Sequence, residues 1–88
     1  ITSMKGAYPN PFKANTNIEV SLKAGESGSV TIYNVLGQVV RTFNVEQGTH
    51  TIQWDGMNSK GDTCGSGIYF YKLATPSVNQ TKKMVIVK

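Results

Sequence analysis

Apolar and polar residues alternate along most of the chain with a period of two, the pattern of half-buried β-strands. One run places Ile18, Val20 and Leu22 on one face with polar residues between them, and Val30 and Ile32 begin another. No stretch has apolar residues at the i, i+3, i+4 and i+7 spacing of an amphipathic helix over three turns. The pattern therefore predicts strands and no helix.

A turn at residues 34–38 separates the run at Val30 from a further run over residues 39–45. Gly37 in this turn can take a positive φ, so the two runs should form a hairpin. The second arm alternates less regularly than the first. We expect it to contain a β-bulge.

The only tryptophan and the most aromatic run of the chain lie on either side of its densest cluster of turn-forming residues. A strand should end at Trp54, and after the loop Tyr69 and Tyr71 share one face while Ile68 and Phe70 share the other. Aromatic side chains of this size suit the core and its margin. The segment is predicted to be strand, loop and strand.

Near the start, Tyr8, Pro9, Asn10, Pro11 and Phe12 should form a stiff extended hook. The two prolines fix φ and remove two backbone donors, and each restricts the residue before it. We expect the rings of Tyr8 and Phe12 to pack on the body of the domain and Asn10 to bond to backbone.

The remaining segments complete the picture of a β-protein. Residues 1–7 are either a short edge strand or part of a linker, and residues 74–79 form the last turn. The final strand has apolar residues on both faces near its end and gathers lysines, over Lys82, Lys83, Met84, Val85, Ile86, Val87 and Lys88. Turn signals every 8–12 residues or so predict an all-β, Ig-like antiparallel β-sandwich of about seven short strands.

Length and composition favour one folded domain over residues 1–88. Hydrophobic residues make up 39% and charged residues 16%, as in ordinary globular domains. The formal net charge of +4 is spread along the chain, which is weak support for nucleic-acid binding. No apolar run is long enough for a helix to span a bilayer, and the beginning lacks the pattern of a signal peptide.

The residues with chemical potential do not converge on a reaction. The single cysteine, Cys64, cannot form an internal disulfide and is better explained as a small packing residue. In the loop after Trp54, Asp55 and Asn58 should bond to nearby amides in Asx-turns, with an irregular Ca²⁺ site that includes Asp62 as the alternative. We predict no enzyme activity, no cofactor and no metal site.

Several of these motifs together resemble the type A C-terminal sorting domain of the type IX secretion system. They are the Tyr8 to Phe12 hook, Val30 to Gly37, Trp54-Asp55-Gly56 with Gly61, and Ser66-Gly67-Ile68-Tyr69-Phe70-Tyr71-Lys72-Leu73. The Ig-like domain of the flagellar hook-capping protein is closely similar to that family. The resemblance covers almost the whole chain. It departs from the family at Lys13-Ala14, where an Asn-Pro pair is common, and at Cys64.

The resemblance implies a module at the end of a larger exported protein, with the cargo domain before it in the same chain. Its partner would be the outer-membrane secretion machinery. Its location would be secreted or at the cell surface, reached through the periplasm of a Gram-negative bacterium. Neither nucleic acid nor a small-molecule substrate is implied.

An exposed last strand would offer unpaired N–H and C=O groups to a receptor sheet, and its lysines would attract an acidic surface. We therefore hypothesise that the translocon reads Lys82 to Lys88. The alternative is a structural strand with solvated lysines. Two further classes stay open: a structural Ig-like accessory or assembly module, and a carbohydrate-binding module that uses Tyr33, Tyr69 or Trp54. An open sheet edge could also support a dimer.

Overall fold

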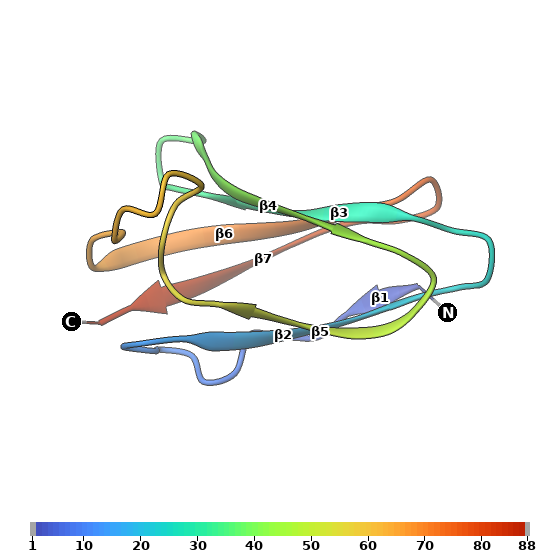
Figure 1. Cartoon of the computed structure of the whole chain (residues 1–88), viewed down its shortest axis with the longest axis horizontal. Helices are drawn as coiled ribbons and strands as arrows, with labels where there is room; N and C mark the ends of the chain where they lie inside the picture. The colour runs from blue at the N-terminus through green and yellow to red at the C-terminus, as the bar shows by residue number, and fades with distance from the viewer. Residues whose placement is uncertain (1, 88) are drawn as a thin grey trace.

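Seven strands form two antiparallel sheets that stack face to face in the computed structural model, which describes residues 2–87 (Figure 1). One sheet has the strand order β1-β2-β5 and the other β4-β3-β6-β7. The predicted sandwich is confirmed, and no helix occurs in the described range, so none could cross a membrane. The strands are β1 (Ser3–Met4), β2 (Thr16–Leu22), β3 (Gly28–Tyr33), β4 (Val39–Val45), β5 (Gly48–Trp54), β6 (Gly67–Ala74) and β7 (Asn79–Ile86).

The alternating apolar residues of both sheets meet between them and form the core. Ile18 of β2 and Ile32 of β3 have no exposed surface, and neither does Trp54 at the end of β5. The Trp54 ring packs edge-on against Phe12 and Tyr69, with centroid distances of 5.6 Å to each. Such edge-to-face pairs stabilise a core beyond their buried area. The tryptophan is therefore the centre on which the hook, β5 and β6 converge.

The β3–β4 hairpin has the turn and the bulge that the sequence predicts. Asn34 accepts hydrogen bonds from the amides of Leu36 and Gln38 through Oδ1, and Gly37 has φ of 81°. The register then shifts between Ile32 and Tyr33, so that β4 contains one extra residue. The shift sets which side chains of β4 face outward near the turn.

Asx-turns order the loop after Trp54, as predicted. Asp55 Oδ1 accepts a hydrogen bond from the amide of Met57 at 3.1 Å, and Asn58 Oδ1 accepts from the amides of Lys60 and Asp62 at 2.9 and 3.0 Å. Two of the three side chains of the possible Ca²⁺ site, those of Asp55 and Asn58, thus accept hydrogen bonds from the backbone. No group of three or more His, Cys, Asp or Glu residues suited to a metal occurs within residues 2–87.

The lead-in is part of the fold and forms the edge strand β1. Met4 is buried with 3% of its surface exposed, and Thr2 donates a hydrogen bond through its hydroxyl to Glu26. The amide of Ala7 donates to the Tyr71 hydroxyl at 2.7 Å. Burial raises the pKa of Tyr71, while the bond from the Ala7 amide lowers it. The first described residues therefore join the two sheets.

Candidate functional site

The proposed recognition segment is β7 and the residues after it, at the edge of the four-stranded sheet. Met84 and Ile86 point into the core and are almost completely buried. Lys83 and Val85 alternate with them and point outward, Lys83 exposed and Val85 half-buried. Lys82 is half-buried and Val87 exposed, while Lys88 lies outside the described residues. The segment is thus both a core strand and part of the surface.

The Tyr8–Phe12 hook covers the edge of β7 that does not pair with β6. The amide of Phe12 donates to the carbonyl of Val85 at 3.0 Å, and the amide of Val87 donates to the carbonyl of Phe12 at 2.9 Å. The Asn10 side chain continues this pairing: its Oδ1 accepts from the amide of Val85 at 3.0 Å, and its Nδ2 donates to the carbonyl of Lys83 at 3.3 Å. A side-chain amide thus bonds the strand as a peptide group would.

This arrangement corrects the expectation that the last strand offers unpaired backbone groups. Four backbone groups along this edge already have partners in the hook. They are the amide and the carbonyl of Val85, the carbonyl of Lys83 and the amide of Val87. A receptor strand could add along this part of the edge only if the hook left it. The sequence held a signal for this: prolines on both sides of Asn10 lack backbone donors, which leaves its side chain to make the bonds.

The two rings of the hook behave differently. Phe12 is buried against Trp54, as expected. Tyr8 is 79% exposed, so the prediction that its ring packs on the domain is wrong. Its backbone makes the contact instead, because the amide and carbonyl of Tyr8 pair with Asn17 at 2.9 Å each. The Tyr8–Pro9 and Asn10–Pro11 peptide bonds are both cis.

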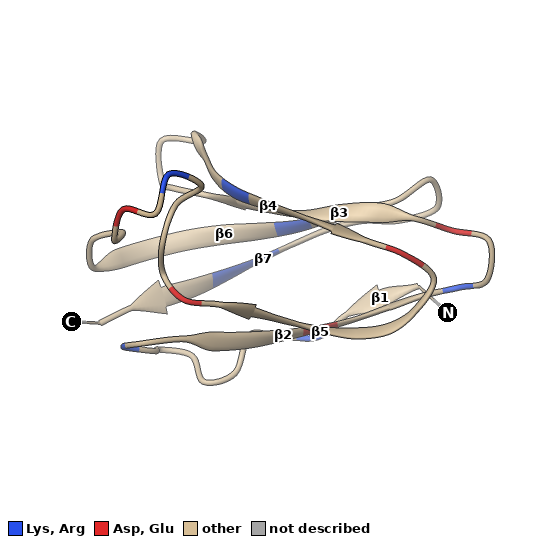
Figure 2. Cartoon of the chain, in the orientation of Figure 1, with Lys and Arg blue, Asp and Glu red and all other residues tan. Residues whose placement is uncertain are grey.

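Charge is distributed unevenly between the two sheets. The four strands of the β4-β3-β6-β7 sheet contain four basic residues and no acidic residue (Figure 2). The basic residues are Arg41, Lys72, Lys82 and Lys83, and the acids of the chain lie in β2 and in connecting segments, at Glu19, Glu26, Glu46, Asp55 and Asp62. Arg41 is paired with Asp55 at 3.3 Å, so the three lysines are the groups of this sheet that would attract an acidic surface.

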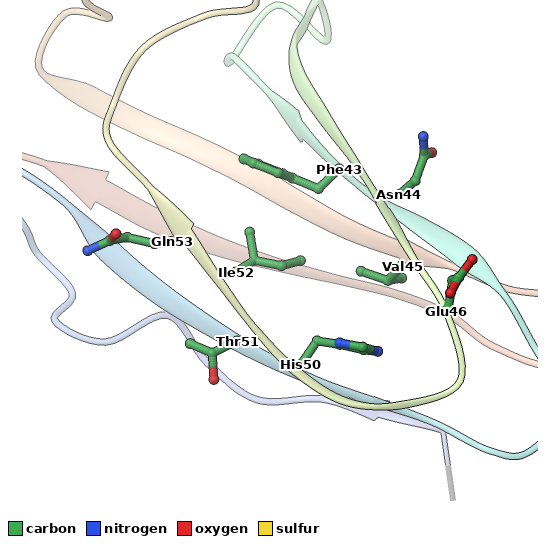
Figure 3. Close-up of a pocket in the computed structure, with 8 residues that line it drawn as sticks. All are labelled: Phe43, Asn44, Val45, Glu46, His50, Thr51, Ile52 and Gln53. Atoms are coloured by element: carbon green, nitrogen blue, oxygen red, sulfur yellow. The ribbon is translucent and has the colours of Figure 1, made fainter.

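An open groove of about 540 Å³ separates the free edges of β4 and β5, on the side of the sandwich away from β7. Figure 3 shows the apolar side chains of Phe43, Val45 and Ile52 between the two strands, with Asn44 and Thr51 pointing away. Polar groups of Glu46, His50 and Gln53 complete the lining. None of the predicted recognition residues lies in this groove.

The structure removes two of the three aromatic residues considered for sugar binding. Trp54 is fully buried and donates through Nε1 to the carbonyl of Met57 at 2.9 Å. Tyr69 is 9% exposed and donates to the carbonyl of Gly65 at 2.8 Å, and burial is the main cause that raises its pKa. Neither ring can stack on a sugar. Tyr33 is half-buried on the outer side of its sheet.

Comparison with known families identifies the chain at this point. The model of the secretion system C-terminal sorting domain matches residues 6–87, from the last residues before the hook to the end of the described strand region. The chain belongs to this family. Its members are non-catalytic C-terminal sorting signals for type IX secretion, which implies secretion across the outer membrane. No curated protein sequence matches the chain significantly.

Two solved structures share the fold. Dimeric latent PorU from Porphyromonas gingivalis has a TM-score of 0.79 and 22% identity, and the match covers 99% of this chain and 9% of PorU. PorZ, an essential surface component of the type IX secretion system of the same bacterium, has a TM-score of 0.65 and 20% identity, with 99% and 11% covered. The chain thus spans about a tenth of the length of either protein.

Proposed function

We propose that residues 1–88 are a single C-terminal Ig-like domain that directs a larger cargo protein through the type IX machinery without catalysis of its own. The family match over residues 6–87 is the observation that carries this proposal. The cargo would precede the domain in the same chain and would reach the medium or the cell surface through the periplasm of a Gram-negative bacterium.

We propose further that the outer-membrane machinery recognises the terminal segment, Lys82 to Lys88. Lys82 and Lys83 lie on an edge strand, in a sheet whose strands hold no acidic residue. Charges of one sign on a partly exposed strand speed encounter with an acidic receptor and set its orientation. Because the hook occupies the backbone of Val85, the side chains are better placed than the strand edge to make the first contact.

The test must keep the strand, because Met84 and Ile86 are core residues and deletion of Lys82 to Lys88 would remove them. A folded reporter with a signal peptide and this domain at its C-terminus is expressed in a type IX-competent cell. The K82E/K83E variant is compared with K13E/K60E, which reverses two exposed lysines elsewhere. Both variants take the formal net charge from +4 to 0, since each Lys→Glu change subtracts two.

We expect the wild-type and K13E/K60E fusions to reach the surface or medium and K82E/K83E to stay in the periplasm, folded. Export of K82E/K83E at the wild-type rate would refute the proposal that the machinery recognises the terminal lysines, and it would leave the sorting function intact. If the folded wild-type fusion itself stays in the periplasm, the sorting proposal fails, and a structural Ig-like accessory module takes its place.

A further inference from the structure

Apolar side chains form a continuous row on the outer side of the four-stranded sheet, which faces away from the core. The register aligns Val39 of β4 with Tyr33 of β3, Tyr33 with Phe70 of β6, and Phe70 with Lys83 of β7. Directly aligned side chains on one face of a sheet contact one another. The row therefore crosses all four strands and ends in a lysine.

The next row adds Ile68 of β6 and Val85 of β7, which are also aligned. The neighbours of these residues along the strands are buried on the opposite side, so the row residues must point outward. Val39 is 63% exposed and Ile68 43%, and the other members are half-buried. We name this surface the outer apolar face; it consists of Val39, Tyr33, Ile68, Phe70 and Val85.

Basic groups border the outer apolar face. Lys83 ends its first row, and Lys72 lies one row further along β6, aligned with Thr31 and Thr81. Both lysines belong to the sheet whose strands contain no acid, and their segments are the blue parts of β6 and β7 in Figure 2. An apolar centre with a polar, charged rim is the anatomy of a protein interface. The complement of this rim is acidic.

A second copy of this domain and a cargo domain in the same chain fit this face less well than a separate acidic protein does. A second copy would bring another face with the same basic border and no acidic residue in its strands, so it would supply no opposite charge for Lys72 and Lys83. A cargo domain joined before Thr2 would attach at the opposite end of the sandwich from the C-terminus, beside the other sheet (Figure 1). Charge and position together thus favour a separate protein as the occupant.

A polysaccharide fits this surface less well than a protein. Sugar sites combine aromatic rings with hydrogen-bonding groups, whereas the residues aligned beside Tyr33 and Phe70 include Val39, and the next row is Ile68 and Val85. An apolar protein surface would bury these aliphatic side chains on binding, which a sugar ring would do less completely.

We infer that the outer apolar face is the docking surface for a protein of the export machinery, one with an apolar patch bordered by Asp and Glu. This inference rests on the proposed function and specifies which surface of the domain the machinery contacts. It also agrees with the closed edge of β7, because a partner can reach Val85 and Lys83 from the outer side while the hook stays in place.

The test uses the same reporter fusion with V39S/I68S, which removes the two most exposed members of the face. The matched control is V35S/L36S, which removes two exposed apolar side chains at the tip of the β3–β4 hairpin. Thermal unfolding of each purified domain checks the fold. If V39S/I68S unfolds early, V39T/I68T replaces it, because threonine keeps the β-branched shape that strands favour.

With wild-type export established, we expect export of the V39S/I68S fusion to be at least about tenfold slower, since truncation of the side chains that carry most of an interface's binding energy weakens it by that factor or more. V35S/L36S should keep the wild-type rate. K72E should slow export and K60E should not, because Lys72 lies in a strand beside the face, whereas Lys60 belongs to the loop after Trp54.

Wild-type export of the folded V39S/I68S or V39T/I68T fusion would overturn the inference while the sorting function stands. An equal loss in V35S/L36S would overturn it too, because the strand rows would then not be what the partner contacts. Sedimentation of the isolated domain and binding to purified cell-surface polysaccharide complete the test. A wild-type dimer that V39S/I68S dissociates, or polysaccharide binding that it abolishes, would assign the face to a different occupant.

Discussion

Gly28 shows how closely the end of β6 approaches β3 at one end of the sheet. It pairs with Val45 of β4, and a Cβ at this position would overlap the backbone carbonyl of Ala74, where β6 ends, and meet the Thr75 side chain. Position 28 therefore requires glycine for a steric reason, because the backbone atoms of Ala74 cannot move aside as a flexible side chain can. The strand pattern of the sequence gives no sign of it.

We therefore predict that Gly28→Ala destabilises the domain by about 1–3 kcal/mol, the usual cost of an extra carbon in a filled site. Gly65→Ala is the matched control, since a Cβ there meets nothing within 4 Å. Urea unfolding of both variants measures the difference. Equal stability of the two variants would contradict the close approach of Gly28 to Ala74.

At the scale of elements, alternation and turn residues located the strands from β2 to β7, whereas β1 stayed undecided between an edge strand and a linker. The runs at Ile18, Val30 and Tyr69 became β2, β3 and β6, because one face of each is buried and the other is not. The bulge in β4 was also visible as a break in the alternation. Strand order was a different matter, because period-two patterns do not say which strands become neighbours.

The hook was the element that the sequence predicted least completely. The two prolines predicted that the hook is stiff, and Phe12 predicted where it packs. Nothing in the sequence predicted that the hook binds the edge of β7, more than seventy residues later. A contact of this range depends on the assembled sandwich rather than on local propensity. For the same reason the terminal strand was expected to be open, when part of its edge is closed.

This closure leads to a prediction for Asn10. Its side chain bonds the Val85 amide and the Lys83 carbonyl, so Asn10→Ala should cost about 1–3 kcal/mol and speed hydrogen exchange of the Val85 amide. Asn15→Ala is the control, because Asn15 is exposed and its side chain makes no hydrogen bond within residues 2–87. Native-state hydrogen exchange by NMR measures the amide directly.

Asn10→Asp separates the two bonds. The carboxylate can still accept from the Val85 amide but cannot donate to the Lys83 carbonyl. We expect Val85 to remain protected and the loss of stability to be smaller than in Asn10→Ala. Unchanged protection of Val85 in Asn10→Ala would mean that the hook backbone alone closes the edge.

At the scale of the whole molecule, the sequence suggests a recognition segment but gives no sign of the outer apolar face. The terminal position and lysines of Lys82 to Lys88 were visible in the chain, and they led to strand addition as the expected mode of contact. The outer apolar face was not visible as a unit, because Val39, Tyr33 and Phe70 come from three strands and meet only through the register. Separate single residues on polar faces look ordinary in a sequence.

The folded unit also extends beyond the part that the family match covers. The match begins at residue 6, whereas Thr2 and Met4 are buried and β1 pairs with β2. A chain that begins at Gly6 should therefore be less stable than the full chain by about 2–5 kcal/mol, the range for loss of one buried Met side chain. Thermal unfolding followed by circular dichroism measures it, with a chain that begins at Thr2 as the control.

Acid should narrow this difference, for a reason that involves Glu26. Its side chain accepts hydrogen bonds from Thr2 and Ser77. Both bonds lower the pKa of Glu26 below the usual value of 4.5, and the bond from Thr2 has the larger effect. A carboxylate with a lowered pKa stabilises the fold above its unfolded pKa, and the contribution is lost as the pH falls through the folded pKa. The chain that begins at Gly6 lacks the Thr2 bond at any pH. The gap between the two unfolding temperatures should therefore shrink as the pH falls from about 7 to well below 4.5, and a gap that stays constant as Glu26 becomes protonated would show that Met4 and β1 account for all of it.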